Sequence, residues 1–299
     1  MQGRILKGVG GFYYVHAEDG EIYACRAKGI FRKEGVKPLP GDIVSLEVTH
    51  EKDREGSLIS IAERKNVLIR PAAANIDKVL VVFSVTEPEP NLNLLDRFLI
   101  YMGAQGLTSS IFFNKEDIDA KAEGKRLKDI YESAGYRVLL GSVKEEDVKT
   151  EIEELLYGST TILAGPSGVG KSSLINLLHG RILSETGELS ERIKRGKQTT
   201  RHTEIFSIGE GSYILDTPGF TSLSLTELHI DGLKSEDIKY YYDEFATYFP
   251  KCRYNTCSHI HEPEELCAVK QALSRGELHR ERYENYVQIY EEMRAAERH

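Results

Sequence analysis

Residues 165–172 read Gly-Pro-Ser-Gly-Val-Gly-Lys-Ser, and this stretch decides the fold of the 299-residue chain. It fits the pattern G-x-x-x-x-G-K-[ST], and it lies between the strand-like run Thr161–Ala164 and the helix-like run Lys171–Leu178. Glycines allow the backbone to wrap around phosphates, so that the loop amides and the helix N-terminus face the negative charge. The stretch therefore predicts a phosphate-binding P-loop within an α/β domain.

Two side chains of this loop have distinct predicted roles. Lys171 is placed to reach the β- and γ-phosphates of a nucleotide, and Ser172 is placed to ligate Mg²⁺. The motif by itself does not distinguish ATP from GTP. The predicted nucleotide contacts of the loop are Gly165, Pro166, Ser167, Gly168, Val169, Gly170, Lys171, Ser172 and Ser173.

A second motif, N-K-E-D at residues 114–117, selects guanine when it is combined with a P-loop. The carboxylate of Asp117 can accept the N1–H and exocyclic amine hydrogens of guanine, a pattern that adenine lacks. Asn114 can bond the base edge and tie down the P-loop, while Lys115 can pack over the base plane. The predicted GTP contacts also include Glu116, and Ser142 is a candidate contact to the guanine carbonyl.

A third motif, D-x-x-G at residues 216–219, follows another short strand. Asp216 is expected to hold Mg²⁺ through water, and the amide of Gly219 is expected to sense the γ-phosphate. A threonine between the P-loop and this motif must close over the ion; we choose Thr200, with Thr199 as the alternative. The predicted Mg²⁺ ligands are thus Ser172, Thr200 and Asp216.

The residue after the third motif bears on hydrolysis. Many GTPases carry a glutamine there to orient the attacking water, but this chain has Phe220, so we expect slow intrinsic hydrolysis. His202 or a group supplied by a partner is the candidate for positioning the water; the alternative for His202 is a surface residue without a catalytic role. The predicted catalytic set is Lys171, Thr200, His202 and Gly219.

The order of the motifs is unusual. N-K-E-D and the Ser142 stretch precede the P-loop, whereas in most GTPases the P-loop comes first. A parallel sheet tolerates such a circular permutation, because all these loops gather at the carboxyl edge of the strands. Strands and helices alternate through residues 67–227, which predicts a mostly parallel sheet and a central α/β P-loop GTPase domain.

Residues 1–66 are rich in short β-type runs punctuated by Gly, Asp and Pro. Five such runs in so short a segment predict a small β-barrel of the OB-fold class, which often binds RNA. The loop Lys28–Pro40 is basic, and it could either contact an oligonucleotide or be an ordinary solvated loop. Its basic residues are Lys28, Arg32, Lys33 and Lys37.

Residues 228–299 are predicted to form a helical domain with a metal site. Cys252, Cys257, His259 and Cys267 fall within sixteen residues, and three thiolates with one imidazole suit a structural, tetrahedral Zn²⁺. His261 is a competing ligand because it lies only two positions from His259. The alternative to a metal site is that the three cysteines are unrelated thiols without a metal. Tyrosines spaced by three and four toward the C-terminus predict one inward-facing helix surface.

Composition limits the range of functions. The formal net charge is −8, so any RNA binding must use local basic patches, because the protein as a whole is acidic. We find neither an apolar run long enough to cross a bilayer nor a signal-peptide pattern, and we expect a cytoplasmic monomer without a membrane partner. The isolated Cys25 is expected to be a buried small hydrophobe.

These features resemble the RsgA family of small ribosomal subunit biogenesis GTPases, also called YjeQ or YloQ, over nearly the whole chain. The resemblance rests on the permuted order of N-K-E-D, G-P-S-G-V-G-K-S, T-T-R-H and D-T-P-G-F, together with the barrel and the cysteine segment. It implies a cytoplasmic late-assembly factor that binds the small (30S) ribosomal subunit and its rRNA, and whose GTP hydrolysis the subunit stimulates. The implied cofactors are one structural Zn²⁺ and Mg²⁺ with GTP.

Two other functions remain open at this point. One is a GTP-binding regulatory protein that acts on a non-ribosomal protein target, against which the OB barrel argues. The other is a GTP-binding regulator that does not hydrolyse its nucleotide, for which Phe220 is mild support. GTP turnover with and without small subunits distinguishes both from a ribosome-assembly GTPase.

Overall fold

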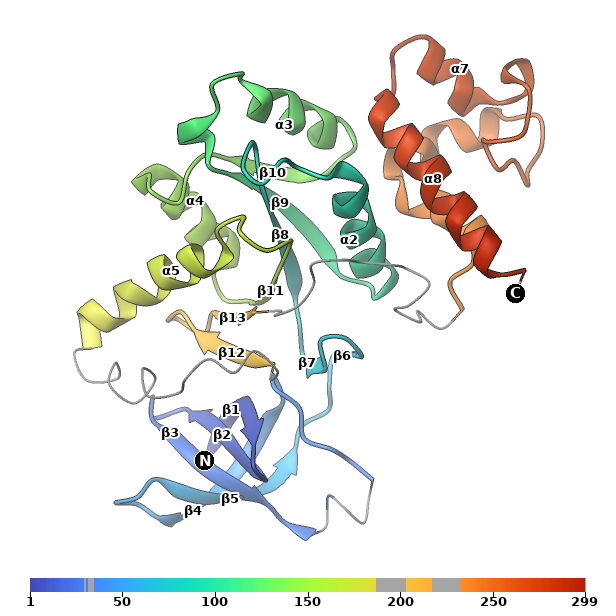
Figure 1. Ribbon diagram of the computed structural model, residues 1–299. Helices are drawn as coiled ribbons and strands as arrows, with labels where there is room; N and C mark the ends of the chain where they lie inside the picture. The colour runs from blue at the N-terminus through green and yellow to red at the C-terminus, as the bar shows by residue number, and fades with distance from the viewer. Residues whose placement is uncertain (30, 32–34, 187–202, 217–231, 299) are drawn as a thin grey trace. The chain divides into compact units, whose positions relative to one another are not determined.

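The computed structural model of the protein describes residues 1–29, 31, 35–186, 203–216 and 232–298 (Figure 1). The chain divides into two compact units, and each of them combines segments that are distant in sequence. The first unit contains Met1–Lys78, Lys149–Leu163 and Ser172–Gly219, and the second contains Val79–Val148, Ala164–Lys171 and Phe220–His299. The domain boundaries predicted at residues 66 and 227 stay predictions.

The N-terminal segment is a closed five-stranded barrel, which confirms the prediction (Figure 1). Its strands are β1 (Gln2–Val9), β2 (Phe12–Ala17), β3 (Ile22–Ala27), β4 (Ile43–His50) and β5 (Glu55–Ile61), in the order β1-β2-β3-β5-β4. Neighbouring strands are antiparallel except for the parallel pair β3 and β5. Closure pairs every strand on both sides, so the barrel exposes no sheet edge.

An apolar core fills this barrel. Alternate residues of the strands point inward, and the fully buried ones include Ile5, Val15, Cys25, Val44 and Leu58. The predicted role of Cys25 as a small hydrophobe is confirmed, because its side chain is fully buried and burial raises the pKa of its thiol to about 11. A short hairpin follows the barrel and was not predicted; its strands are β6 (Val67–Leu68) and β7 (Ala73–Ala74).

Six further strands form one sheet in the order β10-β9-β8-β11-β13-β12. They are β8 (Lys78–Ser84), β9 (Thr108–Asn114), β10 (Arg137–Leu140), β11 (Thr160–Ala164), β12 (Glu204–Ser207) and β13 (Tyr213–Asp216). β9 and β10 are parallel, as are β11 and β13, whereas β12 runs antiparallel to β13. The prediction of a mostly parallel sheet agrees with these pairings.

Helices alternate with these strands as the sequence predicted. They are α2 (Leu92–Ala104), α3 (Glu123–Ser133), α4 (Glu146–Leu156) and α5 (Lys171–Thr186), with a short 3-10 turn η1 (Glu116–Ile118) after β9. The side chain of Asn91 caps α2 by accepting a hydrogen bond from the backbone N–H of Leu94 at 3.0 Å. Such a cap satisfies one of the backbone donors that every helix N-terminus leaves free.

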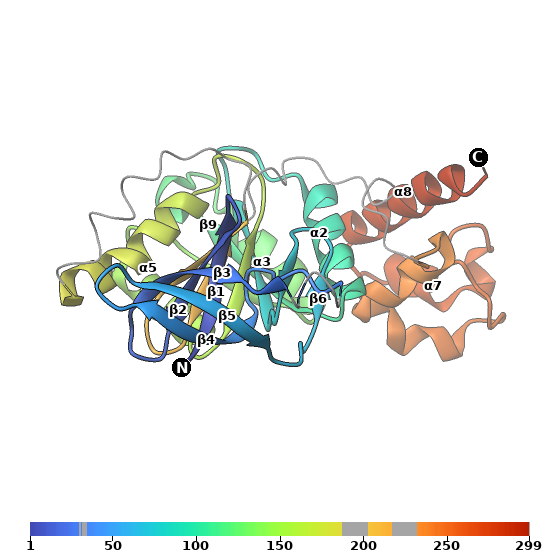
Figure 2. The same ribbon diagram turned by 90° about the horizontal axis from the view of Figure 1, so that it is seen from below.

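The C-terminal segment is helical, as predicted, but three of its helices are of the tight 3-10 type. It consists of η2 (Ser235–Tyr241), η3 (Asp243–Lys251), η4 (Glu264–Leu266), α7 (Ala268–Ser274) and α8 (Arg280–Ala296). Within the second unit α8 packs on α2 and η2, and the two long helices lie side by side in both ribbon views (Figures 1 and 2). Tyr286, Tyr290 and Met293 are buried on one face of α8, which confirms the predicted stripe.

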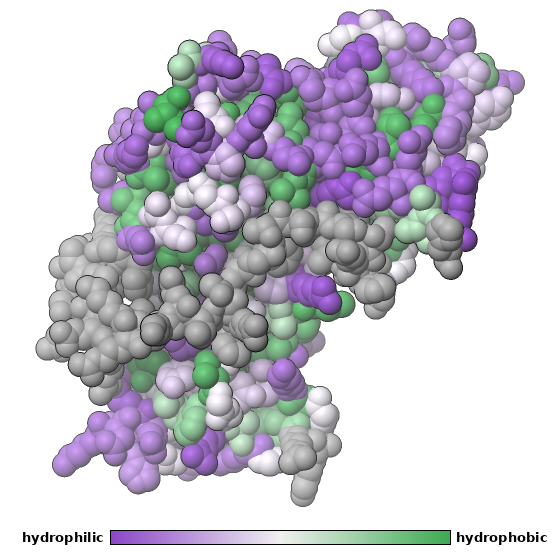
Figure 3. All heavy atoms as spheres, in the orientation of Figure 1, coloured by the Kyte–Doolittle hydropathy of each residue, from purple (hydrophilic) through white to green (hydrophobic). Residues whose placement is uncertain are grey.

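The surface over this segment is mainly hydrophilic on the face seen in Figure 3. Polar and charged side chains cover it because the apolar residues of its short helices turn inward. Within the described ranges of the chain, no helix combines the length and apolar character that crossing a membrane demands.

Candidate functional sites

The P-loop connects β11 to α5, as the sequence predicted. Gly165 and Gly170 have φ angles of +135° and +105°, which side chains other than glycine rarely adopt. A Cβ atom on Gly165 would lie 2.1 Å from the carbonyl oxygen of Val82, and one on Gly170 would lie 2.2 Å from the side-chain nitrogen of Asn114. Close packing therefore requires glycine at Gly165 and Gly170.

Asn114 joins the loops of the predicted guanine-binding end, which consists of residues 114–117 and 142–144, to the P-loop. Its side chain is almost fully buried at the end of β9, and its amide nitrogen donates to the carbonyl of Val169 in the P-loop at 2.8 Å. Its amide oxygen accepts from the backbone N–H groups of Lys115 at 2.8 Å and Val143 at 3.1 Å. The predicted tie to the P-loop is thus present, and one N–H of Asn114 is left for a base edge.

Lys115 is fastened in a way that the sequence did not suggest. Its ammonium donates to the backbone carbonyls of Gly168, at 2.8 Å, and Glu87. The charged end therefore braces the P-loop against the segment that leads to α2, while the aliphatic stem is the part available to a base plane. Glu116 donates its backbone N–H to the carbonyl of Gly141 at 3.1 Å, and its side chain is exposed.

Asp117 lies beside two hydrogen-bond donors. Lys144 approaches its carboxylate to 2.5 Å, and the bonds from Lys144 and then Ser142 lower the pKa of Asp117 below its ordinary value. Asp117 is therefore ionised at neutral pH and can only accept hydrogen bonds. That is the form that guanine recognition requires. Ser142 itself is buried next to this carboxylate, where the sequence predicted a base contact.

The remaining predicted nucleotide residues lie as follows. Lys171 begins α5, and its ammonium donates to the carbonyls of Gly165 and Pro166, both at 2.7 Å. Ser172 and Ser173 are exposed in the first turn of α5. Asp216 ends β13, and the parallel pairing of β11 with β13 sets it opposite Leu163, two residues before the P-loop.

Several predicted residues lie outside the described part of the chain. They are Arg32 and Lys33 of the barrel loop, and Thr199, Thr200, His202, Gly219 and Phe220 of the two switch segments. Their predicted roles stay predictions.

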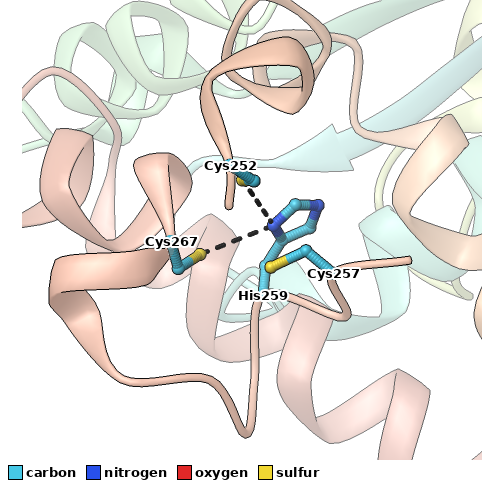
Figure 4. A group of neighbouring side chains, drawn as sticks. All are labelled: Cys252, Cys257, His259 and Cys267. Carbon is cyan, nitrogen blue, oxygen red and sulfur yellow. Dashed lines mark hydrogen bonds between the residues drawn. The ribbon is translucent and has the colours of Figure 1, made fainter. Parts of the chain in front are cut away.

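The four predicted metal ligands converge in the C-terminal segment, with their side chains pointing toward one another (Figure 4). The Nδ1 atom of His259 lies 3.7 Å from the sulfur of Cys252 and 3.5 Å from that of Cys267, and all four ligand atoms lie within 4.8 Å of one another. Ligand atoms around a tetrahedral Zn²⁺ are about 3.5–3.8 Å apart, given bonds of about 2.3 Å to sulfur and 2.0 Å to nitrogen. The Cys3His group therefore has a geometry that can hold a metal ion.

The chemistry of the four donors also suits a metal. Burial, followed by the nearby Lys239 ammonium, lowers the pKa of His259 to about 4, so the imidazole is neutral and able to coordinate. Burial raises the pKa values of the Cys257 and Cys267 thiols, and a cation among them offsets that penalty on the thiolates. His261 lies apart from the cluster and bonds Arg294 at 3.2 Å, which decides between the two histidines.

Tyrosines of α8 hold the metal-binding loop from outside. The hydroxyl of Tyr283 donates to the carbonyl of His259 at 2.7 Å, and that of Tyr286 donates to the carbonyl of Ser258 at 2.5 Å. The ring of Phe249 stacks on the imidazole, with centroids 5.1 Å apart and planes at 5°. The sequence predicted that the tyrosines of this helix face belong to the core. The structure adds that the hydroxyl of Tyr283 also positions His259, one of the four predicted metal ligands.

A buried ionic network joins α2 to α8, and the sequence reasoning did not predict it. Asp96 is completely buried and pairs with Arg282, whose guanidinium also bonds Glu244 at 2.8 Å. Burial opposes the charge on Arg282, but the two carboxylates outweigh it and raise its pKa well above the ordinary value. The sequence did contain a hint of this network, because Asp96 and Arg97 lie within an otherwise apolar helix and buried charges need partners.

Comparisons with known proteins agree with these sites. A sequence model described as RsgA GTPase matches residues 61–226, and one described as RsgA N-terminal domain matches residues 2–57. A protein of Agathobacter rectalis named Small ribosomal subunit biogenesis GTPase RsgA is 48% identical, with 98% of each chain covered. A protein of the same name from Alkaliphilus metalliredigens is 43% identical and covers 100% of this chain and 99% of its own.

Two solved structures have the same architecture. One is described as YloQ, a circularly permuted GTPase; it has a TM-score of 0.77 and 36% identity, over 99% of this chain and 95% of that one. The other, YjeQ from Thermotoga maritima, has a TM-score of 0.77 and 31% identity, over 98% of both chains. The predicted combination of β-barrel, permuted GTPase domain and cysteine–histidine cluster is thereby confirmed.

Proposed function

Because this chain belongs to the RsgA family of small ribosomal subunit biogenesis GTPases, we propose that it acts in late maturation of the small subunit and that the subunit stimulates its GTP hydrolysis. The observation that carries the proposal is the fastening of the N-K-E-D loop to the P-loop through Asn114 and Lys115. Asp117, the predicted guanine contact, and the P-loop belong to the same compact unit, which supports the proposal.

The nucleotide is held by three kinds of group in this proposal. The ionised Asp117 accepts the N1–H and amine hydrogens of guanine, and the P-loop amides surround the phosphates. Lys171 exchanges its present carbonyl partners for β- and γ-phosphate oxygens. Mg²⁺ offsets phosphate charge when bound, with Ser172, Asp216 and Thr200 as its protein-side ligands.

Slow intrinsic turnover follows from Phe220, which cannot orient a water molecule. Docking on rRNA is proposed to order the basic segment 192–202, so that Thr200 and His202 take their places near the nucleotide. Completion of a GTPase site by a partner raises rates by about 10³- to 10⁵-fold in other systems. Release of the γ-phosphate then passes through the D-x-x-G segment to the adjoining C-terminal segment and weakens its hold on the subunit.

The Cys3His cluster is proposed to hold one structural Zn²⁺ through Cys252, Cys257, His259 and Cys267. A bound Zn²⁺ supplies charge and fixed geometry to a segment built from short helices, and its four protein ligands leave no position for a substrate. The protein is proposed to be a cytoplasmic monomer whose barrel and zinc-binding segment contact rRNA.

Measuring GTP turnover with and without purified small subunits tests the main proposal. We expect stimulation that falls as the salt concentration rises, and tighter subunit binding in the GTP form than in the GDP form. Lys171→Ala should abolish or severely reduce both intrinsic and stimulated turnover. Removing charge at Lys194, Arg195 and Lys197 should reduce stimulated turnover much more than intrinsic turnover.

Three outcomes would count against the proposal. Absence of stimulation at low salt would contradict the ribosomal role and favour a non-ribosomal target. Unchanged turnover of Lys171→Ala would contradict the assigned active site. Equal loss of both rates in the charge-removal variant would contradict the role of the basic segment.

Nucleotide choice has a separate test. Asp117→Asn should shift the preference from guanine toward xanthine, because an amide can donate to the 2-oxo group of xanthine. Binding constants for GTP and XTP measure this shift directly. Unchanged GTP binding by the variant would rule out the assigned role of Asp117.

A further inference from the structure

A small cavity lies beside the metal cluster, on the outer side of its histidine. Its volume is about 70 Å³, and its lining includes the ligands Cys257 and His259 together with Lys239, Tyr240, Phe249 and Tyr254. All of these residues belong to the second unit. The cavity is not part of the predicted nucleotide site, and the metal ligands coordinate on the other side of the histidine ring. The polar and aromatic residues that line it therefore need a separate explanation.

Aromatic rings form the mouth and wall of the cavity. Tyr240 and Tyr254 are 60% and 50% exposed, which is high for large aromatic residues. Tyr240 meets Phe249 edge to face, with ring centroids 5.8 Å apart and an interplanar angle of 89°. Exposed aromatic rings beside a cation are the usual platform on which proteins stack single-stranded nucleic acid bases.

Lys239 brings a positive charge to the wall of the cavity. Its side chain is buried, and its ammonium donates to the carbonyl of Cys257 at 3.0 Å while lying 5.2 Å from the centroid of Tyr240. An ammonium has three hydrogens to donate. Within the described ranges no carboxylate forms an ion pair with it, so the charge is available to an acceptor in the cavity.

His259 supplies a second donor. Its Nδ1 atom faces the cysteine sulfurs, so its Nε2 atom carries the hydrogen when Nδ1 coordinates a metal. Figure 4 shows this second nitrogen on the side of the ring away from the sulfurs. The atom is buried, has no hydrogen-bond partner, and belongs to a residue that is only 1% exposed. A buried unpaired donor of this kind is unfavourable until an acceptor reaches it.

We propose that this cavity receives the keto edge of an unstacked uracil or guanine base of single-stranded RNA, with the base ring stacked on Tyr240 and Tyr254. The cavity is smaller than a nucleobase, so only the acceptor edge enters it and the ring remains among the exposed tyrosines. The keto oxygen accepts from Lys239 and, after a small opening of the aromatic wall, from His259. The inference rests on the RNA partner proposed above and names the group that one of its surfaces recognises.

The surroundings favour RNA over a protein partner. Exposed Lys251 and Arg253 lie three and one positions before Tyr254, where they can meet the phosphates that flank a bound base. A protein could stack an aromatic side chain on the tyrosines and bring a backbone carbonyl nearby, but only a nucleobase carries the stacking ring and the keto oxygen in one rigid plane. Adenine carries an amino group where the keto oxygen is needed, and it should bind more weakly.

The experiment uses the full-length, metal-loaded protein and two fluorescein-labelled RNA hexamers, hexauridylate and hexaadenylate. Fluorescence anisotropy should show tighter binding of hexauridylate. Tyr240→Ala and Tyr254→Ala should each weaken that binding roughly 5- to 100-fold, the range expected when a base–aromatic stack is lost. Tyr254→Phe keeps the ring and should bind nearly as wild type does.

Two controls separate this role from a structural one. Tyr157 is 65% exposed outside the C-terminal segment, so Tyr157→Ala should leave hexauridylate binding unchanged. Elemental analysis should find the same metal content in every variant, since the substituted tyrosines are not ligands. Equal affinity for the two hexamers, no binding of either, or unchanged affinity in both alanine variants would each overturn the proposal.

Subunit-stimulated GTP turnover, measured on the same samples, keeps this inference distinct from the proposed function. Stimulation with no effect of the tyrosine substitutions on hexamer binding would overturn the base pocket and leave the ribosomal role standing. Selective hexauridylate binding without any stimulation of GTP turnover would support the base pocket and contradict the proposed ribosomal role.

Discussion

The guanine-selective end and the metal-binding loop belong to the same compact unit, but they are held together in different ways. At the guanine end, Asn114 and Lys115 satisfy backbone groups of the P-loop directly, so protein alone fixes the loops. At the metal-binding loop, Tyr283 and Lys270 bond the backbone from outside, but the four ligand side chains meet one another only through three thiols and an imidazole. We therefore expect the first region to keep its shape without nucleotide, and the second to need a bound metal ion for full stability.

This difference matters for function. A nucleotide site that exchanges GTP for GDP must keep its shape while it is empty, and side-chain bonds to backbone provide that. A segment that only has to present a surface can rely on a permanently bound ion. Helices α2 and α8 connect the two regions through buried charges, so the connection itself can be tested.

The largest expected effect is that of removing the metal. Chelation, or Cys257→Ser, should unfold the loop 252–267, because structural Zn²⁺ contributes roughly 10 kcal/mol in small zinc domains. Hydrogen exchange should show loss of protection there and at the neighbouring face of α8. GDP binding by the same samples should change little, since Asn114 and Lys115 hold the guanine end.

Removing the nucleotide provides the matched comparison. Exchange within the P-loop should change only modestly, because its bonds to Asn114 and Lys115 remain. A collapse of the guanine end on metal removal, or of the metal loop on nucleotide removal alone, would contradict the contrast between the two regions.

The next effect concerns the connection between them. Arg282→Met leaves the carboxylates of Asp96 and Glu244 buried without a cation, which should cost about 3–5 kcal/mol in the free energy of unfolding. Urea unfolding measures this cost, and Asp96→Asn in the same background should recover part of it. Arg126→Met is the control, because its pair with Glu281 is about half exposed and should be worth less than about 1 kcal/mol. Equal costs for the two arginines would show that burial of the pair is unimportant.

A smaller effect is expected within the guanine end. Asn114→Ala leaves the carbonyl of Val169 and the N–H groups of Lys115 and Val143 without their partner. We expect GTP affinity to fall by about 1–3 kcal/mol, the usual cost of unpaired buried polar groups, with metal content unchanged. Fluorescent-nucleotide titration measures it. Glu116→Ala, in the same motif but with an exposed side chain, should have little effect, and an equal loss in both variants would refute the role of Asn114.

The smallest effect is a change in pH dependence. Lys144 and then Ser142 hold the pKa of Asp117 below its ordinary value, and only the ionised carboxylate accepts from guanine. Binding should therefore persist as pH falls and be lost only as pH passes below the ordinary aspartate range of about 4. In Lys144→Ala that pKa rises toward its ordinary value, so the loss should begin at higher pH. GDP titrations from pH 7 to pH 4 measure the shift, and identical profiles would exclude the assigned role of Lys144.

The sequence was enough to predict most of the helices and strands, and the position of the P-loop between β11 and α5. The reason is that the information is local: strand period, loop glycines and the spacing of Asn114 to Asp117 are each contained in a few consecutive residues. The cysteine cluster was equally accessible, since its four ligands fall within one short segment. The pattern could not choose between His259 and His261, because two histidines two positions apart satisfy the same spacing rule.

Tertiary structure alone decided which side chains meet. The bond from Asn114 to Val169 spans 55 positions, and the pair of Asp96 with Arg282 spans 186. A sequence pattern gives the face of a helix or the end of a strand on which a residue lies, but it does not name the partner across the core. The order of residues along the chain was therefore enough to predict a P-loop, an N-K-E-D motif for guanine and a Cys3His group that could hold a metal. Packing decided that Lys115 braces the P-loop, that tyrosine hydroxyls hold the ligand histidine, and that buried charges join α2 to α8, because each of these contacts forms only after distant segments have come together.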